Sequence, residues 1–284
     1  MSVGNPTAPH LGERFRALRN ERGWTLDGLA VRTELSKAFL SRLEANDRQP
    51  SLEALVTLAR VFGVPISALL EPAPARVMAL NVGNPEHLPG WKGRSAILKR
   101  PVNTPLRLGK NGFEGDTQAD RLHHGSSDRA VCVYPLEHYQ FWQSKLKRKL
   151  EDASFGENLS TAGLTEYEVC IGDVFKLGFA KVQVSEPRSP CRTLAVRLAQ
   201  PKLEEWFAQS GLTGFYLRVL KPGMVRPEDT LELLERPVRG ITIAEANRVM
   251  HMEVKNRTSA LHVLTQPALS VAWKAALEVK LESD

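Results

Sequence analysis

The chain has 284 residues, of which 42% are hydrophobic and 25% charged, and its formal net charge is +6. That composition is ordinary for a soluble globular protein, and the length allows two domains. Three cysteines in such a chain exclude a disulfide framework and indicate a reducing compartment.

The sequence shows no signal peptide and no apolar run as long as a transmembrane helix. We therefore expect a cytoplasmic protein without membrane contact. Up to Ala75 there are nine basic and eight acidic residues. Any contact of this first part with DNA must therefore depend on where single charges lie, since the part as a whole is nearly neutral.

The first seventy residues carry apolar side chains at helical spacing. Leu11, Phe15 and Leu18 indicate a helix that Gly23 ends. A serine or threonine that can cap a helix precedes each of three further helices, at Thr25, Ser36 and Ser51. A short last turn can follow Pro65. The pattern predicts a five-helix, all-α domain over residues 10–71.

Three segments of this region carry a specific resemblance: GWTLDGLA at 23–30, LSKAFLSRLE at 35–44 and QPSLEAL at 49–55. Together they resemble the Cro/C1-type (XRE) helix-turn-helix family. The resemblance implies a third helix in the DNA major groove and a homodimer on a two-fold site. It places near DNA bases or phosphates Thr25, Ser36, Lys37, Ala38, Ser41, Arg42, Asn46 and Arg48.

One residue departs from that family's pattern. Many members have Gln after the capping Thr, where it braces a phosphate contact, whereas this chain has Leu26. A helical protein-interaction module that does not bind DNA stays the alternative.

Residues 72–76 read as a Pro/Ala linker, and a strand-rich region follows from Val77. Within it, Val182 and Val184 alternate with polar residues, which predicts a half-buried strand. Pro187 and Pro190 then end the strand and present Cys191 in a loop. The flanking Arg188 and Arg192 favour the thiolate, which a soft metal such as molybdenum or copper needs. A buried structural cysteine is the alternative from this segment alone.

Three further clusters are ambiguous when taken singly: GFEGDTQAD at 112–120 followed by HHG at 123–125, AVCVYP at 130–135, and FGENL at 155–159. Adjacent histidines on a strand point to opposite faces and would not readily share one ion. Cys132 and Cys170 have apolar neighbours and read as core thiols, while His138 and Tyr139 read as packing residues. Asn158 could simply close a turn.

In this order, however, the motifs GDxxAD, HHG, FGENL and PRxPC resemble the MOSC domain (molybdenum cofactor sulfurase C-terminal), in its YiiM-like branch. The resemblance implies a multidomain chain, with a β-barrel-like mixed α/β domain over 77–240 and a small helical C-terminal unit over 241–284. We expect helices near 241–252, 260–265 and 268–281. Two turns depart from the pattern, at Ser126 and at Glu228-Asp229.

The same resemblance implies an open pocket for the molybdenum cofactor (molybdopterin). It assigns Cys191 as catalytic residue and molybdenum ligand, and Asn158 as a polar neighbour of the cofactor. His124, Asp116 and Asp120 fall in the pocket-forming motif, and Arg188 suits the pterin phosphate or a sulfur-borne charge.

The expected function is a DNA-binding protein whose molybdenum centre reduces small N-hydroxylated compounds, such as hydroxylamino-purines, with an external electron donor. Two alternatives stay open. The second domain could be a non-catalytic ligand sensor of a transcription regulator, or the helical domain could serve dimerisation alone.

Overall fold

The computed structural model describes residues 11–45, 47–66, 69, 75–117, 126–253 and 255–283. The chain forms two compact units, Met1–Pro74 and Ala75–Asp284, and each is described by itself below. Strand β1 already begins at Ala75, so the strand-rich unit starts two residues before the expected boundary at residue 77. Among the described residues, no helix is both long and apolar enough to cross a membrane.

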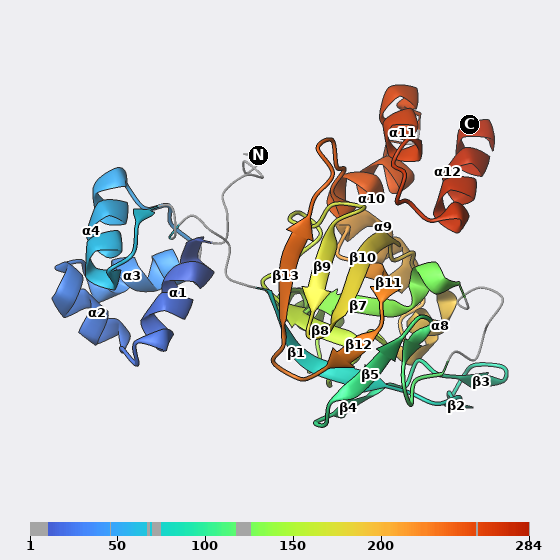
Figure 1. Ribbon diagram of the computed structural model, residues 1–284, viewed down its shortest axis with the longest axis horizontal. Helices are drawn as coiled ribbons and strands as arrows, with labels where there is room; N and C mark the ends of the chain where they lie inside the picture. Colours follow the sequence, from blue (N-terminus) through green and yellow to red (C-terminus); the bar gives the residue numbers. More distant parts are fainter. Residues whose placement is uncertain are drawn as a thin grey trace. The chain divides into compact units, whose positions relative to one another are not determined.

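The first unit is helical, as the sequence predicts (Figure 1). Its long elements are α1 (Leu11–Glu21), α2 (Leu26–Thr33), α3 (Lys37–Glu44) and α4 (Leu52–Phe62). The hydroxyls of Thr25, Ser36 and Ser51 accept the backbone N–H three residues on, at 3.0, 3.2 and 3.3 Å. These contacts confirm the three predicted caps. In the predicted last turn only Ile66 and Leu69 are described, and both are helical.

A buried ion pair fixes α3 against α1. Glu44 is only 4% exposed, and its two carboxylate oxygens accept hydrogen bonds from Arg19 at 2.7 and 2.8 Å. A bidentate pair of this kind sets orientation as well as contact. Apolar side chains from all four helices fill the space between them: Leu11, Phe15, Leu18, Leu29, Leu40, Leu43, Leu58, Ala59 and Phe62.

The second unit is built on a closed β-barrel (Figure 1). Its strands are β1 (Ala75–Val82), β7 (Val131–Pro135), β8 (Leu159–Ala162), β9 (Val174–Leu177), β10 (Ala180–Pro187), β11 (Phe215–Lys221) and β13 (Thr230–Glu235). They pair in the order β13-β9-β10-β11-β7-β8-β1, and β1 pairs again with β13 to close the ring. Only β7 and β8 are parallel among these neighbours, and β4 (Arg100–Val102) extends the sheet beside β1. The expected barrel-like fold is thus confirmed.

Side chains along each barrel strand point alternately into the barrel core and to the opposite face of the sheet. Val131 and Val133 on β7, and Val182 and Val184 on β10, belong to the same buried apolar cluster. Because neighbouring residues on a strand point to opposite faces, Cys132 faces away from that cluster.

A second apolar core lies on that other face, around α7 (Glu137–Leu146), α8 (Arg192–Arg197) and α9 (Leu203–Ser210). Tyr134 stacks on Phe155 with ring centroids 4.1 Å apart, and Trp142 stacks on Phe207 at 4.8 Å. Smaller elements complete this part: the hairpin β2 (Glu86–His87) and β3 (Arg94–Ser95), the short helix η1 (Ser127–Arg129), and a sheet of β5 (Leu106–Gly109), β6 (Gly112–Phe113) and β12 (Gly223–Val225).

The C-terminal helices are α10 (Ile243–His251), α11 (Arg257–Leu264) and α12 (Val271–Ser283). The first and last begin two and three residues later than expected, and α11 begins three residues earlier. For α12 the start follows from Ser270, whose hydroxyl accepts the Trp273 N–H at 3.1 Å. Trp273 and Leu277 belong to the same buried cluster as the barrel interior, so these helices share the core of the barrel.

Candidate functional site

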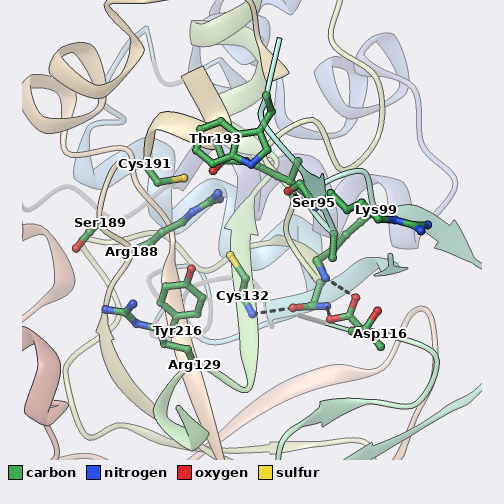
Figure 2. Close-up of a pocket in the computed structure, with 17 residues that line it drawn as sticks. Ser95, Lys99, Asp116, Arg129, Cys132, Arg188, Ser189, Cys191, Thr193 and Tyr216 are labelled. Carbon is green, nitrogen blue, oxygen red and sulfur yellow. Dashed lines mark hydrogen bonds and ion pairs between the residues drawn. The ribbon is translucent and has the colours of Figure 1, made fainter. Parts of the chain in front are cut away.

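A cavity of about 230 Å³ lies on the second unit, on the face of β7 and β11 that points away from the barrel core. Its walls come from the hairpin β2–β3, from β7 and β11, and from the segment after β10 (Figure 2). The lining residues are Trp91, Arg94, Ser95, Ala96, Ile97, Lys99, Asp116, Thr117, Arg129, Cys132, Gly156, Asn158, Arg188, Ser189, Cys191, Thr193 and Tyr216.

Cys191 is placed in this cavity by the end of β10 and the start of α8. The strand ends at Pro187, and Cys191 occupies the position just before α8, with its carbonyl accepting the Leu194 N–H at 3.1 Å. The thiol is half-buried and reaches the cavity wall (Figure 2). Arg192 is exposed and does not line the cavity, so of the two flanking arginines only Arg188 does.

Arg188 is the least satisfied group of the site. Its side chain is only 5% exposed, and its Nη1 has no hydrogen-bond partner among the described residues. Burial opposes the charge, but the nearby Cys132, Tyr216 and Cys191 outweigh it and hold the pKa of Arg188 above its usual value. A buried N–H without a partner costs about 1–3 kcal/mol or more when charged. The guanidinium therefore suits an anion bound in the cavity.

Asn158 and Asp116 form a rigid wall. The Asn158 amide donates to Asp116 Oδ2 at 2.8 Å and to the Asn81 carbonyl at 3.2 Å, and its Oδ1 accepts the Cys132 N–H at 3.1 Å. Lys99 pairs with the other oxygen of Asp116. Both amide protons of Asn158 are thus used within the protein, which leaves it one oxygen lone pair for a ligand.

Cys132 and Tyr216 line the cavity although sequence reasoning placed Cys132 in the core and did not single out Tyr216. The two residues are direct cross-strand partners on β7 and β11. Burial raises the pKa of both the Cys132 thiol and the Tyr216 phenol. The sequence could have revealed the position of Cys132, because this residue lies between the core residues Val131 and Val133 on β7 and must therefore point to the opposite face.

A buried carboxylate links the cavity to the C-terminal helices. Glu186 is fully buried and forms an ion pair with Arg129, which lines the cavity. Its other oxygen accepts a hydrogen bond from the hydroxyl of Ser270, which lies just before α12. The guanidinium of Arg129 also lies 5.6 Å from the Tyr216 ring centroid. The position of Arg129 is therefore set partly by the C-terminal helices.

Other predicted residues lie elsewhere. His124 and Asp120 fall outside the described residues, and so does Asn46 of the first unit. His138 is buried against Glu166 at 2.6 Å and Cys170 is buried; neither lines the cavity. Within the described ranges, no group of three or more His, Cys, Asp or Glu side chains could hold a metal ion.

The cavity nevertheless fits an anionic group held through one soft atom. Cys191 is a sulfur donor, the ligand type that molybdenum accepts, and Arg188 offers a buried N–H that no described residue satisfies. Arg94 adds positive charge, whereas Lys99 is paired with Asp116, the one carboxylate among the described residues that line the cavity. The donor set therefore suits a phosphate-bearing cofactor with a metal bound to the thiolate.

In the first unit the predicted DNA-facing residues are on the surface. Exposed side chains include Thr25, Ser36, Lys37, Ala38, Ser41, Arg42 and Arg48. Lys37 pairs with the exposed Asp27 at 2.8 Å, and the Arg48 guanidinium lies 5.1 Å from the Phe39 ring centroid. Leu26 packs against the helical core, and its apolar side chain can offer no hydrogen bond to a phosphate.

Comparisons with known proteins agree with this division. The MOSC domain matches residues 120–232, and a helix-turn-helix domain matches residues 10–71. YflK of Bacillus subtilis (strain 168) is 48% identical over 206 residues, which is 72% of this chain and 93% of YflK. The crystal structure of YiiM from Geobacillus stearothermophilus has a TM-score of 0.64 at 36% identity, and covers 73% of this chain and 100% of that chain.

Two further relatives carry functional names. A reductase of Gibberella moniliformis (strain M3125 / FGSC 7600) is 34% identical over 181 residues, which is 62% of this chain and 31% of the reductase. The HTH-type transcriptional regulator DdrOP3 of Deinococcus deserti (strain DSM 17065 / CIP 109153 / LMG 22923 / VCD115) is 44% identical over 61 residues, which is 22% of this chain and 47% of the regulator.

Proposed function

Because the chain belongs to the MOSC-domain family and also carries an N-terminal helix-turn-helix domain, we propose that it is a DNA-binding molybdenum enzyme. In this proposal the second unit binds the molybdenum cofactor and reduces small N-hydroxylated compounds. The reductase of Gibberella moniliformis supports reductive chemistry at the level of the family.

One observation carries the cofactor assignment. Cys191 borders the same cavity as Arg188, whose Nη1 has no partner in the part of the chain that the structure describes. A soft donor beside a buried, charged N–H is the pair of groups that an anionic metal cofactor requires. In the proposal Cys191 binds the metal and Arg188 binds an anionic part of the cofactor, while Arg94 adds positive charge at the cavity wall.

When bound, the molybdenum cofactor supplies the two-electron, oxygen-accepting chemistry. Conversion of an N–OH group to N–H and water consumes two electrons and two protons, so an external electron donor is required. The protein residues hold the geometry. Asn158 and Asp116 keep the wall rigid through their mutual hydrogen bond. Burial raises the pKa of Tyr216, so its Oη–H stays protonated and can donate a hydrogen bond into the cavity.

The test is the molybdenum content per chain, measured by elemental mass spectrometry on protein from a host that makes the cofactor. We expect near-stoichiometric metal in the wild type and its loss in Cys191→Ala. Cys170→Ala is the matched control, because Cys170 is a thiol of the same unit that does not line the cavity. Absence of metal from the wild type would contradict the proposal and favour a ligand sensor attached to a regulator.

For the first unit we propose binding of double-stranded DNA by a homodimer in the cytoplasm. Each chain carries one helix-turn-helix domain, and such domains bind two half-sites about one helical turn apart. The exposed side chains at the start of α3 support the assignment. A chain that is dimeric but has no affinity for any selected DNA would instead favour dimerisation as the role of this unit.

A further inference from the structure

We propose that Trp91 is the specificity-determining residue of the cavity and that its indole stacks on a planar, heteroaromatic N-hydroxylated substrate. The inference deepens the proposed function and rests on it for the reaction. It selects flat ring compounds over aliphatic hydroxylamines. It also gives a role to a lining residue that neither the cofactor assignment nor the proton chemistry uses.

Trp91 lies at the tip of the hairpin β2–β3, in a turn of defined shape. Its N–H donates to the Leu88 carbonyl at 3.0 Å, and Leu88 is itself only 3% exposed. Gly90 and Gly93 flank it with φ of 81° and 98°, a conformation that side chains other than glycine rarely adopt. The turn is therefore held by its own backbone.

The hairpin is also fastened to the helix that follows Cys191. Arg197 of α8 donates from Nη1 to the carbonyl of Ile97, two residues after β3. A Cβ built on Gly90 would lie 3.4 Å from Val196 Cγ1 of the same helix. The Arg197–Ile97 hydrogen bond ties the end of the hairpin to α8, and Gly90 lies close enough to Val196 that a side chain there would touch it. Trp91 and Cys191 border one cavity.

The other four tryptophans of the chain have their rings covered. Trp24 and Trp142 stack on neighbouring phenylalanines, Trp206 lies 4.9 Å from a lysine ammonium, and Trp273 is only 2% exposed. Trp91 is half-buried, and its indole has no hydrogen bond, ring contact or cation partner within the part of the chain that the structure describes. Because Trp91 also borders the cavity, its indole is available to a ligand bound there.

The chemistry of this face selects planar rings. Stacking of a heteroaromatic base on an aromatic side chain strengthens binding substantially and tolerates different bases, because every base has a π-face. The indole Nε1–H can in addition donate to a ring nitrogen or carbonyl of the ligand. An aliphatic N-hydroxy compound offers neither contact, and its binding gains nothing from Trp91.

The kinetic test compares two substrates on metal-loaded, full-length protein: an N-hydroxylated purine base and N-methylhydroxylamine. For Trp91→Leu we expect kcat/KM to fall roughly 10- to 100-fold for the purine and less than about twofold for N-methylhydroxylamine. Trp91→Phe keeps an aromatic face and should restore most of the purine activity. An equal loss on both substrates, or no loss on either, overturns the inference.

A binding test keeps the inference separate from the proposed reaction. Adenine, the planar part of such a substrate without the N–O bond, is titrated against the full chain while tryptophan fluorescence is followed. We expect quenching in the wild type and in Trp206→Phe, whose indole lies outside the cavity, and no quenching in Trp91→Phe. Adenine binding without turnover in wild-type protein would refute the proposed reaction alone. Turnover with quenching unchanged in Trp91→Phe would refute the role of Trp91 alone.

Discussion

The two units expose their functional residues in opposite ways. On α3 the residues expected to contact DNA are exposed and lie within seven positions of one another, from Ser36 to Arg42. In the barrel unit, Asn158 and Arg188 are less than 6% exposed, and the cavity draws on chain segments from Trp91 to Tyr216. The DNA-facing surface therefore needs only a correctly placed helix, whereas the cavity needs a complete barrel.

This difference has an energetic consequence. Exposed charges are solvated whether or not a ligand is bound, so substitution on α3 should alter DNA affinity with little effect on folding. Buried charges must be paired within the protein or by a ligand. Glu186 and Arg129 are paired with each other, while one nitrogen of Arg188 is not paired among the described residues. In the barrel unit, function and stability are thus coupled.

The largest expected effect is on stability, from Glu186→Gln. The substitution replaces the carboxylate that pairs with Arg129 by a neutral amide, so the largely buried guanidinium loses one of its charged partners. Loss of one member of a buried pair costs about 3–5 kcal/mol of unfolding free energy. Urea unfolding measures the loss, and hydrogen exchange should show that it is confined to residues 75–284. The control Glu232→Gln breaks an exposed pair with Lys176 and should cost almost nothing. Equal losses in the two variants would remove the contrast between buried and exposed charge.

The next effect is a pH dependence that arises in α10. Burial, aided by the charge of Lys280, lowers the pKa of His251 from its usual 6.5 to about 4. The unfolded chain therefore binds a proton that the folded chain excludes, and stability falls as the pH drops from about 6.5 towards 4. After allowance for partial solvent screening, the loss is about 2 kcal/mol.

Urea unfolding at pH 7 and pH 4.5 measures this loss. His251→Gln should reduce the pH dependence by that amount, whereas His262→Gln, at an exposed position of α11, should leave it unchanged. If His251→Gln keeps the full pH dependence, other groups are responsible.

For the first unit we expect an effect on binding without an effect on folding. Arg42→Ala should weaken binding to a DNA site selected from a random pool, by about 1–3 kcal/mol or roughly 5- to 150-fold. Arg60, exposed on α4, is the matched arginine, and Arg60→Ala should bind as the wild type does. A salt titration of both variants separates loss of one phosphate contact from loss of base readout. Unchanged affinity in Arg42→Ala would exclude α3 as the recognition helix.

The smallest effect comes from the cap of α3. Ser36→Ala removes the hydroxyl that accepts the Phe39 N–H and should cost about 1 kcal/mol of stability, while Ser36→Gly should cost only a few tenths. Thermal unfolding, monitored by hydrogen exchange of the α3 backbone amides, measures the stability loss of both variants. If Ser36 contacts DNA as well, the two variants lose similar affinity despite their different stabilities, since both lack the hydroxyl.

The local parts of this protein follow from the sequence. The caps at Thr25, Ser36 and Ser51 and the strand that leads to Cys191 were all predicted, because each depends on residues only a few positions apart. The resemblance to the MOSC domain grouped Asp116, Asn158, Arg188 and Cys191 in one pocket, and all four line the same cavity in the structure. The predicted starts of the C-terminal helices differ from the observed ones by up to three residues. The start of α12 depends on a single hydroxyl, that of Ser270, which the spacing of apolar residues does not reveal.

Other features were decided by the tertiary structure alone. Cys132 reads as a core thiol from its apolar neighbours, but the register of β7 against β11 turns it towards the cavity beside Tyr216. Trp91 and Lys99 reach the same cavity from a segment that Arg197 of α8 holds at Ile97 and that Asp116 holds at Lys99. Glu186, Arg129 and Ser270 meet although up to 141 positions separate them in the sequence. A sequence pattern predicts which face of its own helix or strand a side chain occupies. Which of these faces pack against each other depends on closure of the barrel, because closure joins segments from across the whole unit.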